Sequence, residues 1–190
     1  LSVPGVDVDT TILAAPGQIE LHLTGRGADT GAIDGILDAG VARLEKALGR
    51  SVFSSDGRSL EAVVGDALRE RGWRLAVAES CTGGLLASRL TDVPGSSDYV
   101  ERGVVCYSNR SKTELAGVPA ALIAEHGAVS EPVATALAEG IRSRAGTNIG
   151  IGITGIAGPG GATPEKPVGT VSVAVIVDDE TRVRTFQFIG

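Results

Sequence analysis

A short segment of the chain combines the side chains that covalent catalysis requires. Residues 80–82 read Ser-Cys-Thr; they follow an unbroken apolar stretch at 75–78 and precede Gly83 and Gly84. This order is typical of a turn from a buried strand into a helix, which places hydroxyls and a thiol beside N–H groups without intrahelical partners. The predicted chemistry is nucleophilic attack on an acyl carbon, with the oxyanion held by N–H groups at the start of a helix over 82–92.

The spacing alone leaves the identity of the nucleophile open. Ser80 needs a base, and neither of the two histidines has a route to it, whereas Lys112 can accept a proton if burial lowers its pKa. Cys81 competes with Ser80, because a thiolate is favoured at a helix N-terminus. The same residues also admit structural interpretations: Thr82 as a helix cap before a glycine pair used in packing, and Lys112 as a solvated helix lysine.

Hydrophobic periodicity indicates the elements that position these groups. From residue 59 to residue 154 helical patterns alternate with buried aliphatic strands, expected at 75–78, 103–107 and 149–154. Residues 169–188 then predict a β-hairpin. The expected fold is α/β, a three-layer α/β/α sandwich with a mixed sheet.

The ends of the expected strands bring further polar groups to one edge of the sheet. Parallel strands meet at their carboxyl ends, so the segments that follow them share a crevice. The gathered set is rich in hydroxyls and lysines: Ser80, Thr82, Tyr107, Ser108, Lys112, Thr154 and Lys166. Residues 155–169 are too long and glycine-rich for a simple connection, and we expect them to cover a ligand.

Several other chemistries lack the residues that they need. The letters Gly150-x-Gly152-x-x-Gly155 match a dinucleotide fingerprint, but they lie inside a strand pattern and precede a proline loop, so we discard the match. No GxxxxGK(S/T) phosphate loop occurs. The two histidines have no Cys or carboxylate partners at ligand spacing. The predicted reaction therefore uses neither a metal ion nor an organic cofactor.

Composition excludes some partners and compartments. The net charge is −6 without a block of Lys or Arg, so nucleic acid is not expected as a partner. No apolar run is long enough for a membrane span and no signal-peptide pattern occurs, which predicts a soluble, cytoplasmic protein without a membrane partner. Cys81 and Cys106 lack CxxC spacing, and we expect both to be reduced.

We interpret the start of the chain as a small separate module. The expected domains are residues 1–57 and residues 58–190. Residues 18–24 alternate strictly, as in a half-exposed strand, and a helical repeat follows. A short strand is expected at 51–53, and residues 1–17 are interpreted as a loop or edge strand. The prediction is a β-α-β module of α+β class.

Four ordered motifs resemble those of one family. They are AESCTGG at 78–84, GVVCYSNRSK at 103–112, GAVSEP at 127–132, and GIAGPGG at 155–161 with KPVG at 166–169. This succession is similar to the CinA C-terminal domain over about residues 59–190, and residues 16–57 more weakly resemble the KH-like linker module of longer CinA proteins. That family comprises nicotinamide mononucleotide deamidases. The resemblance implies hydrolysis of the carboxamide of nicotinamide mononucleotide to nicotinic acid mononucleotide and ammonia, a step of pyridine nucleotide salvage.

The resemblance also implies roles for individual residues. Ser80 would be the nucleophile, with Tyr107 and Lys112 as its activating partners. Substrate contacts would come from Thr82, Gly83, Gly84, Thr154, Gly158, Gly160, Gly161 and Lys166. Donors for the 5′-phosphate would be the backbone of the loop glycines or the Lys166 amine.

The sequence departs from the family pattern in ways that bear on function. It has no molybdopterin-binding-like domain, so the ADP-ribose pyrophosphatase activity credited to that domain is not expected. Family members continue beyond the position of Gly190 with an arginine and a closing helix, so a weakened affinity for the mononucleotide is expected. Residues 31–35 read GAIDG, which differs from the GxxG loop with which KH domains hold RNA, so RNA binding is not expected. A homodimer is expected. The alternative is a non-catalytic nucleotide-binding or protein-interaction module.

Overall fold

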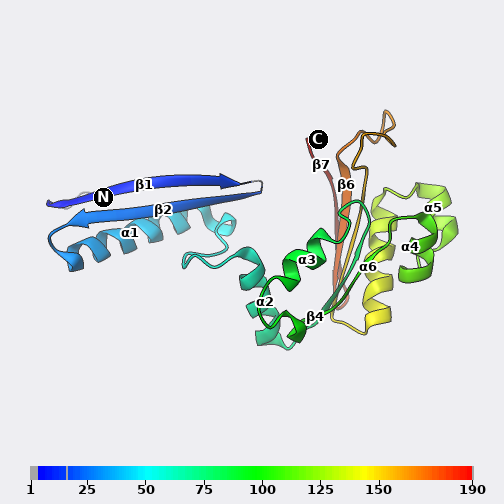
Figure 1. Ribbon diagram of the computed structural model, residues 1–190, viewed down its shortest axis with the longest axis horizontal. Helices are drawn as coiled ribbons and strands as arrows, with labels where there is room; N and C mark the ends of the chain where they lie inside the picture. Colours follow the sequence, from blue (N-terminus) through cyan, green and yellow to red (C-terminus); the bar gives the residue numbers. More distant parts are fainter. Residues whose placement is uncertain (1–3, 16, 190) are drawn as a thin grey trace. The chain divides into compact units, whose positions relative to one another are not determined.

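The computed structural model describes residues 4–15 and 17–189. The chain divides into two compact units, Leu1–Leu60 and Glu61–Gly190, each with its own helices and strands (Figure 1). None of the helices in the described ranges is both long and apolar enough to cross a bilayer. The reactive segment predicted at 78–84 lies in the second unit.

The first unit is a two-stranded antiparallel hairpin that carries one helix. Strand β1 (Val6–Ala15) pairs along its whole length with β2 (Gln18–Gly27). Helix α1 (Thr30–Leu48) follows, and Asp29 caps it because its carboxylate accepts from two N–H groups of the first turn. The helix covers part of one face of the hairpin, which gives this unit a small apolar core.

The α+β class of this unit is confirmed, but the expected β-α-β order is wrong. Residues 6–15, where the sequence shows only weak alternation, form a full strand because pairing with β2 satisfies their backbone groups. Residues 51–53 form no strand, since the chain leaves α1 through the 3-10 helix η1 (Gly49–Ser51). The unit therefore runs β-β-α. Gly31 and Gly35 lie within α1 and not in a GxxG-type loop.

The second unit is a five-stranded mixed sheet between helices. Its strand order is β4-β3-β5-β6-β7; β3 is parallel to β4 and β5, whereas β5–β6 and β6–β7 are antiparallel pairs. The strands are β3 (Leu75–Glu79), β4 (Val100–Val105), β5 (Ile149–Gly155), β6 (Thr170–Val177) and β7 (Glu180–Gln187). The helices are α2 (Leu60–Arg71), α3 (Leu85–Thr91), η2 (Ser96–Asp98), α4 (Asn109–Ala116), α5 (Ala120–His126) and α6 (Glu131–Ala145).

The central strand β3 divides the core between two helical layers. Ala76 and Ala78 face a cluster formed with α4, α5 and α6, whereas Leu75 and Val77 face one formed with α2 and α3. Figure 1 shows the same division, with α6, α4 and α5 on one face of the sheet and α2 and α3 on the other. The predicted three-layer α/β/α sandwich with a mixed sheet is confirmed.

Helix α6 packs directly on β5 because two glycines of that strand have no side chain. A β-carbon at Gly150 would overlap the carbonyl of Ala138, and one at Gly152 would overlap the carbonyl of Ala134. Both carbonyls belong to α6. The glycines that spell the discarded dinucleotide fingerprint therefore allow close approach of a helix to the sheet.

The helix after the reactive segment begins at Leu85, and not near Thr82 as predicted. Residues 81–84 form a turn in which Gly83 and Gly84 have φ values of 61° and 100°. Glycine adopts this left-handed region at little cost, but it cannot continue a right-handed helix. The helical conformation therefore starts only after the glycine pair.

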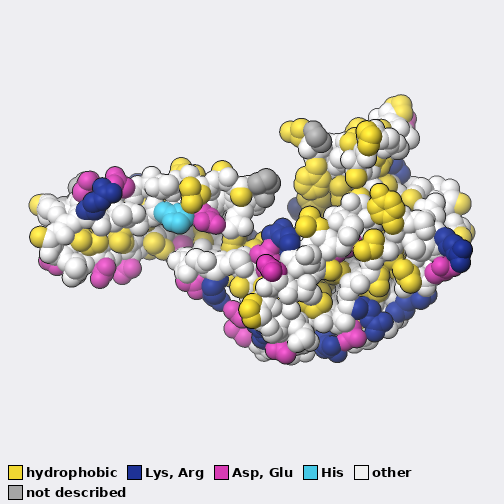
Figure 2. All heavy atoms as spheres, in the orientation of Figure 1, with side chains coloured by type: hydrophobic (Ala, Val, Ile, Leu, Met, Phe, Trp, Pro, Cys, Tyr) yellow, Lys and Arg dark blue, Asp and Glu magenta, His cyan; other side chains and the backbone are white. Residues whose placement is uncertain are grey.

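The surface of the second unit mixes both signs of charge. Figure 2 shows Lys and Arg side chains interspersed with Asp and Glu on the visible face. Arg69, Arg110 and Arg142 each form an ion pair with a carboxylate of their own helix. Ion pairs that are partly or fully exposed, as these are, contribute only about 0–1 kcal/mol each to stability. Their main effect is to keep the local charge of these helices close to neutral.

Candidate active site

Ser80 and Lys112 form a buried pair at the carboxyl end of β3. Ser80 is the first residue after the strand, and Lys112 lies near the start of α4. The Nζ of Lys112 is 3.0 Å from the Oγ of Ser80, although 32 residues separate them in the chain. Ser80 is 6% exposed and Lys112 is 2% exposed. A hydroxyl held against an amine and away from water is an arrangement suited to nucleophilic attack with proton transfer.

The start of α4 positions Lys112. Ser108 and Ser111 form a capping box, in which the hydroxyl of each accepts from the N–H of the other at 3.0 and 2.9 Å. The chain before the helix is tied to β3, because the N–H of Cys106 donates to the carbonyl of Glu79 at 2.6 Å. These contacts fix the direction in which the lysine side chain leaves the helix.

The amine of Lys112 has three oxygen neighbours. Besides Oγ of Ser80, Nζ lies 2.9 Å from the carbonyl oxygen of Cys106 and 3.3 Å from that of Tyr107, and it donates to both. Burial lowers the pKa of Lys112, and the thiols of Cys106 and Cys81 oppose this effect only in part. The neutral amine is therefore populated at lower pH than in a lysine exposed to water.

Cys81 lies next to this pair but is less suited to act as a nucleophile. Burial raises the pKa of its thiol, and the backbone N–H groups of Cys81 and Thr82 and the charge of Lys112 offset this only in part. The expectation that a helix start favours the thiolate is wrong, because the helix begins later, at Leu85. Of the two candidate nucleophiles, Ser80 is the one in contact with a base.

A cavity of about 320 Å³ opens over the Ser80–Lys112 pair, a size typical of small-molecule sites. Seven of the predicted site residues line it: Ser80, Tyr107, Lys112, Thr154, Gly158, Gly160 and Gly161. The other four do not: Thr82, Gly83, Gly84 and Lys166. In residues 4–15 and 17–189, no three His, Cys, Asp or Glu side chains gather closely enough to hold a metal ion.

Part of the cavity wall comes from residues that the sequence analysis did not assign. Ala128 and Val129, between α5 and α6, line the cavity together with Asn109. The hydroxyl of Thr154, which is 1% exposed, donates to the carbonyl of Ala128 at 2.8 Å and holds this connection against β5. The GAVSEP motif at 127–132 was the one sequence feature that pointed to this part of the wall. Its apolar residues indicate no chemistry by themselves.

Lys166 lies outside the cavity and fastens the glycine-rich loop to the connection between α5 and α6. Its Nζ donates to the carbonyl oxygens of His126 at 3.0 Å and Val129 at 2.7 Å. Because two backbone oxygens already bind this amine, it is engaged within the protein and not directed at a ligand. The sequence could not show this contact, since the two carbonyls are 40 and 37 residues away.

Replacing Lys166 with methionine should loosen the loop over residues 156–169. Hydrogen bonds from a charged group contribute roughly 1.5–3 kcal/mol, so amide hydrogen exchange in the loop should accelerate by about 10- to 100-fold. Hydrogen–deuterium exchange followed by mass spectrometry measures this without any substrate. The matched control is Lys46→Met, at an exposed lysine of α1. Unchanged exchange in the loop would show that the two hydrogen bonds do not hold it.

The N–H groups at the start of α3 are not free to hold an oxyanion, so that prediction is wrong. The carboxylate of Glu79 accepts from the N–H of Leu86 at 3.0 Å and from that of Ala87 at 2.8 Å. The N–H of Leu85 donates to the carbonyl of Thr82 at 3.1 Å. A buried carboxylate of the protein thus already occupies the place that the sequence suggested for a substrate anion.

The turn before α3 leaves other donors unoccupied. The N–H of Gly83 donates to the carbonyl of Ser80 at 3.1 Å, whereas those of Cys81 and Thr82 reach no oxygen atom of the described residues. Both of the latter groups lie near the sulfur of Cys81, since they act to lower the pKa of that thiol. Together with the N–H of Gly84, which likewise has no oxygen acceptor among the described residues, they are the N–H groups of this turn that remain available to an oxyanion.

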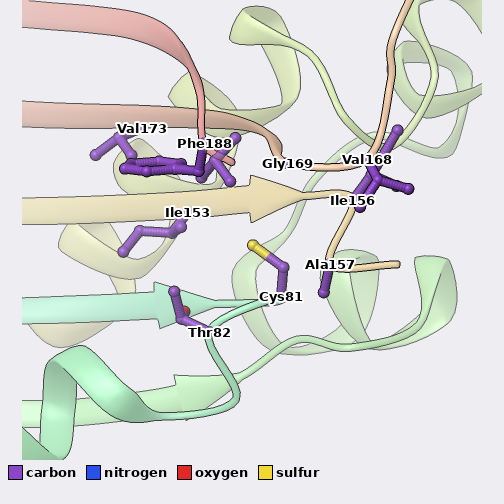
Figure 3. A pocket seen from close by; sticks show the side chains of 10 residues that line it. Cys81, Thr82, Ile153, Ile156, Ala157, Val168, Gly169, Val173 and Phe188 are labelled. Carbon is purple, nitrogen blue, oxygen red and sulfur yellow. The ribbon is translucent and has the colours of Figure 1, made fainter. Parts of the chain in front are cut away.

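An apolar cavity of about 370 Å³ adjoins the first one. The two share Cys81, Ile156 and Ala157. Its other lining residues are mostly apolar: Thr82, Ile153, Val168, Gly169, Val171, Val173 and Phe188. Figure 3 shows the sulfur of Cys81 directed into the space between Ile153 and Ile156. The space beside the reactive turn thus comprises a cavity lined by Lys112 and an apolar cavity, and Cys81 lines both.

Comparison with known proteins identifies a matching family and relatives of this chain. The model of the CinA C-terminal domain matches residues 57–190. A CinA-like protein from Koribacter versatilis is 53% identical over 184 residues, which cover 97% of this chain and 44% of that protein. A CinA-like protein from Geobacter metallireducens is 43% identical over 189 residues, 100% of this chain and 45% of that protein. The chain spans less than half the length of these curated relatives.

Solved structures share the fold of the second unit. The competence damage-inducible protein A of Klebsiella pneumoniae has a TM-score of 0.66 and 40% identity, covering 69% of this chain and 81% of that one. A competence/damage inducible protein of Agrobacterium tumefaciens has a TM-score of 0.67 and 37% identity, covering 72% and 84%. The chain therefore belongs to the CinA family of competence/damage-inducible proteins, and residues 57–190 are its CinA C-terminal domain.

Proposed function

We propose that the second unit hydrolyses the carboxamide of nicotinamide mononucleotide to nicotinic acid mononucleotide and ammonia, without a metal ion. The observation that carries the proposal is the buried contact of 3.0 Å between Nζ of Lys112 and Oγ of Ser80. It supports an amidohydrolase that uses a serine nucleophile and a lysine base. The choice of substrate is supported by membership of the CinA family and by the resemblance of its motifs to nicotinamide mononucleotide deamidases.

The three oxygen neighbours of Lys112 fit the neutral amine that the proposed mechanism requires as well as the charged one. A neutral amine has two N–H donors and one lone pair, whereas an ammonium group has three donors and no lone pair. The carbonyl oxygens of Cys106 and Tyr107 can only accept, so they use the two N–H donors. The lone pair is then left for the third neighbour, and the hydroxyl of Ser80 donates to it across the 3.0 Å contact, whereas a charged Lys112 donates to Oγ of Ser80. In this state Lys112 is ready to take the proton of the nucleophile.

The proposed reaction proceeds through an ester of Ser80. Its Oγ attacks the amide carbon while its proton passes to Nζ of Lys112, and the carbonyl oxygen becomes an oxyanion held by the N–H groups of Cys81 and Thr82. Cleavage of the C–N bond releases ammonia, with the proton from Lys112 going to the leaving nitrogen. Water then attacks the ester and gives a proton to Lys112, which returns it to Ser80 as the acid leaves.

The backbone of the loop over residues 155–169 would contact the nucleotide. Gly158, Gly160 and Gly161 line the cavity, and Gly158 and Gly161 have φ values of 82° and 87°. Glycine permits these conformations, and without a side chain it lets a phosphate approach the peptide N–H groups closely. In this proposal Lys166 supports the loop from outside the cavity and does not touch the phosphate.

The contribution of Tyr107 to activation would come from its backbone. Its carbonyl oxygen accepts from Lys112 at 3.3 Å, whereas its side chain is 72% exposed where it lines the cavity. A phenol so exposed to water does not share the buried environment of the Ser80–Lys112 pair. We therefore assign the support of the base to the carbonyl group of Tyr107 and not to its phenol.

Ammonia release from three amides, measured side by side, tests the proposal. Nicotinamide mononucleotide should exceed nicotinamide riboside in kcat/KM by at least about tenfold, because a contact to the ionised 5′-phosphate contributes roughly 1.5–3 kcal/mol. It should also exceed NAD, whose phosphate is esterified. A chelator should leave the rate unchanged, and inactivation by the chelator would contradict the metal-free mechanism. Tight binding of the mononucleotide in calorimetry without ammonia release would favour a non-catalytic binding module instead.

A further inference from the structure

Glu79 places a buried carboxylate directly behind the nucleophile. It is the last residue of β3, it is 1% exposed, and it lines neither cavity. Its Oε2 accepts from the N–H of Leu86 at 3.0 Å and its Oε1 accepts from the N–H of Ala87 at 2.8 Å. Both donors belong to the first turn of α3, where N–H groups have no partner within the helix. The side chain thus joins the end of a strand to the start of the next helix.

The backbone of the same residue is joined to the segment that carries the base. The carbonyl of Glu79 accepts from the N–H of Cys106 at 2.6 Å, and the carbonyl of Cys106 in turn accepts from Nζ of Lys112 at 2.9 Å. The turn over residues 80–84 therefore runs between two fixed points. One is the contact of the Glu79 side chain with α3, and the other is the contact of its backbone with Cys106.

We propose that Glu79 is a positioning residue, which holds the turn so that Ser80 faces Lys112 and the N–H groups of Cys81 and Thr82 face the reacting carbonyl. This inference rests on the proposed amidase function. By occupying two first-turn donors of α3, the carboxylate leaves the oxyanion to the donors of the turn. A carboxylate suits this task because it offers two acceptors to two N–H groups, whereas an amide offers one acceptor and sets an NH₂ group against the second N–H.

A purely structural cap would make the same two hydrogen bonds, so the test must separate the amount of folded protein from its reactivity. A fluorophosphonate that reacts with activated serines does this, because it forms an adduct on Ser80 whatever the natural substrate is. The final labelled fraction, read by mass spectrometry, counts the competent molecules. The second-order labelling constant reports how well each of them presents the serine to its base and its oxyanion donors.

The test compares Glu79→Gln and Glu79→Asp with the unmutated chain. Gln loses one acceptor, and Asp keeps both but is one methylene too short to reach α3. Each should lower the labelling constant by about 10- to 100-fold, because small displacements of a reacting group have effects of that order. The final labelled fraction should stay the same, and kcat for the mononucleotide should fall by a similar factor with KM within about twofold. The matched control is Asp29→Asn, which makes the same change from carboxylate to amide at a cap of α1, where Oδ1 of Asp29 accepts at 2.9 and 3.2 Å, and it should leave the labelling constant unchanged.

A labelling constant within twofold of the unmutated chain in both variants would overturn the proposal, and so would a reduced labelled fraction with an unchanged constant. One measurement needs no variant. In the unmutated chain the amide protons of Leu86 and Ala87 should be protected from exchange by at least about 100-fold, and unprotected amides there would also overturn the proposal. If the chain is labelled at Ser80 but releases no ammonia from any amide, the proposed function fails and the role of Glu79 is still decided by the labelling constants.

Discussion

Ser80→Ala should lower kcat for nicotinamide mononucleotide by about 10⁴- to 10⁶-fold, while KM stays within about threefold. The variant loses the atom that forms the acyl bond, and the remaining groups can at most assist a direct attack by water. The side chain occupies little of the cavity that would bind the nucleotide, so ground-state binding should change little. Ammonia release by the purified chain measures both constants, with the substrate varied above and below KM.

The matched control for this variant is Ser88→Ala, at an exposed serine of α3 that lines neither cavity, which should keep the full rate. Cys81→Ala separates the two candidate nucleophiles. If Ser80→Ala retains turnover and Cys81→Ala is inactive, the thiol carries the acyl group and the proposed mechanism is wrong. That result would also require the enzyme to lower the pKa of a thiol that burial raises.

Lys112→Met should lower kcat by about 10³-fold and abolish the dependence of the rate on pH that the base confers. Burial lowers the pKa of Lys112. Only the neutral amine can take the proton of Ser80, so the rate of the unmutated enzyme should rise with pH through this lowered pKa. It should level off below pH 10.5, the ordinary pKa of lysine. In Lys112→Met the rise should be absent.

Lys112→Arg tests whether a positive charge alone suffices at this position. A guanidinium group is never neutral in this pH range, so the arginine variant should be as inactive as the methionine variant. Lys46→Met, at an exposed lysine, is the control and should keep the pH profile of the unmutated enzyme. A rising limb that persists in Lys112→Met would mean that another group is the base.

The central pairing of the site could be predicted from the sequence because it depends on a general property of parallel sheets. Strands β3 and β4 are parallel neighbours, so the segments after them meet at one edge. Ser80 follows the first strand and Lys112 lies soon after the second. The order of apolar segments was enough to bring these two residues together, and likewise to predict the mixed sheet and its helical layers.

The contacts that complete the site could not be predicted, because they depend on distances set by the folded backbone. Glu79 reaches α3 only because the chain reverses at Gly83 and Gly84. Lys166 finds its two carbonyl partners on a distant connection, and no feature of its own segment indicates them. In the first unit, cross-strand pairing of residues 6–15 outweighs a weak local pattern.

The position of α6, and with it part of the cavity wall, depends on a glycine of β5. Any residue larger than glycine at Gly152 would have to push α6 away from β5, since its β-carbon would overlap the carbonyl of Ala134. The segment just before α6 carries Ala128 and Val129, which form part of the cavity wall. A glycine that does not line the cavity therefore influences one of its walls through the packing of α6 on β5.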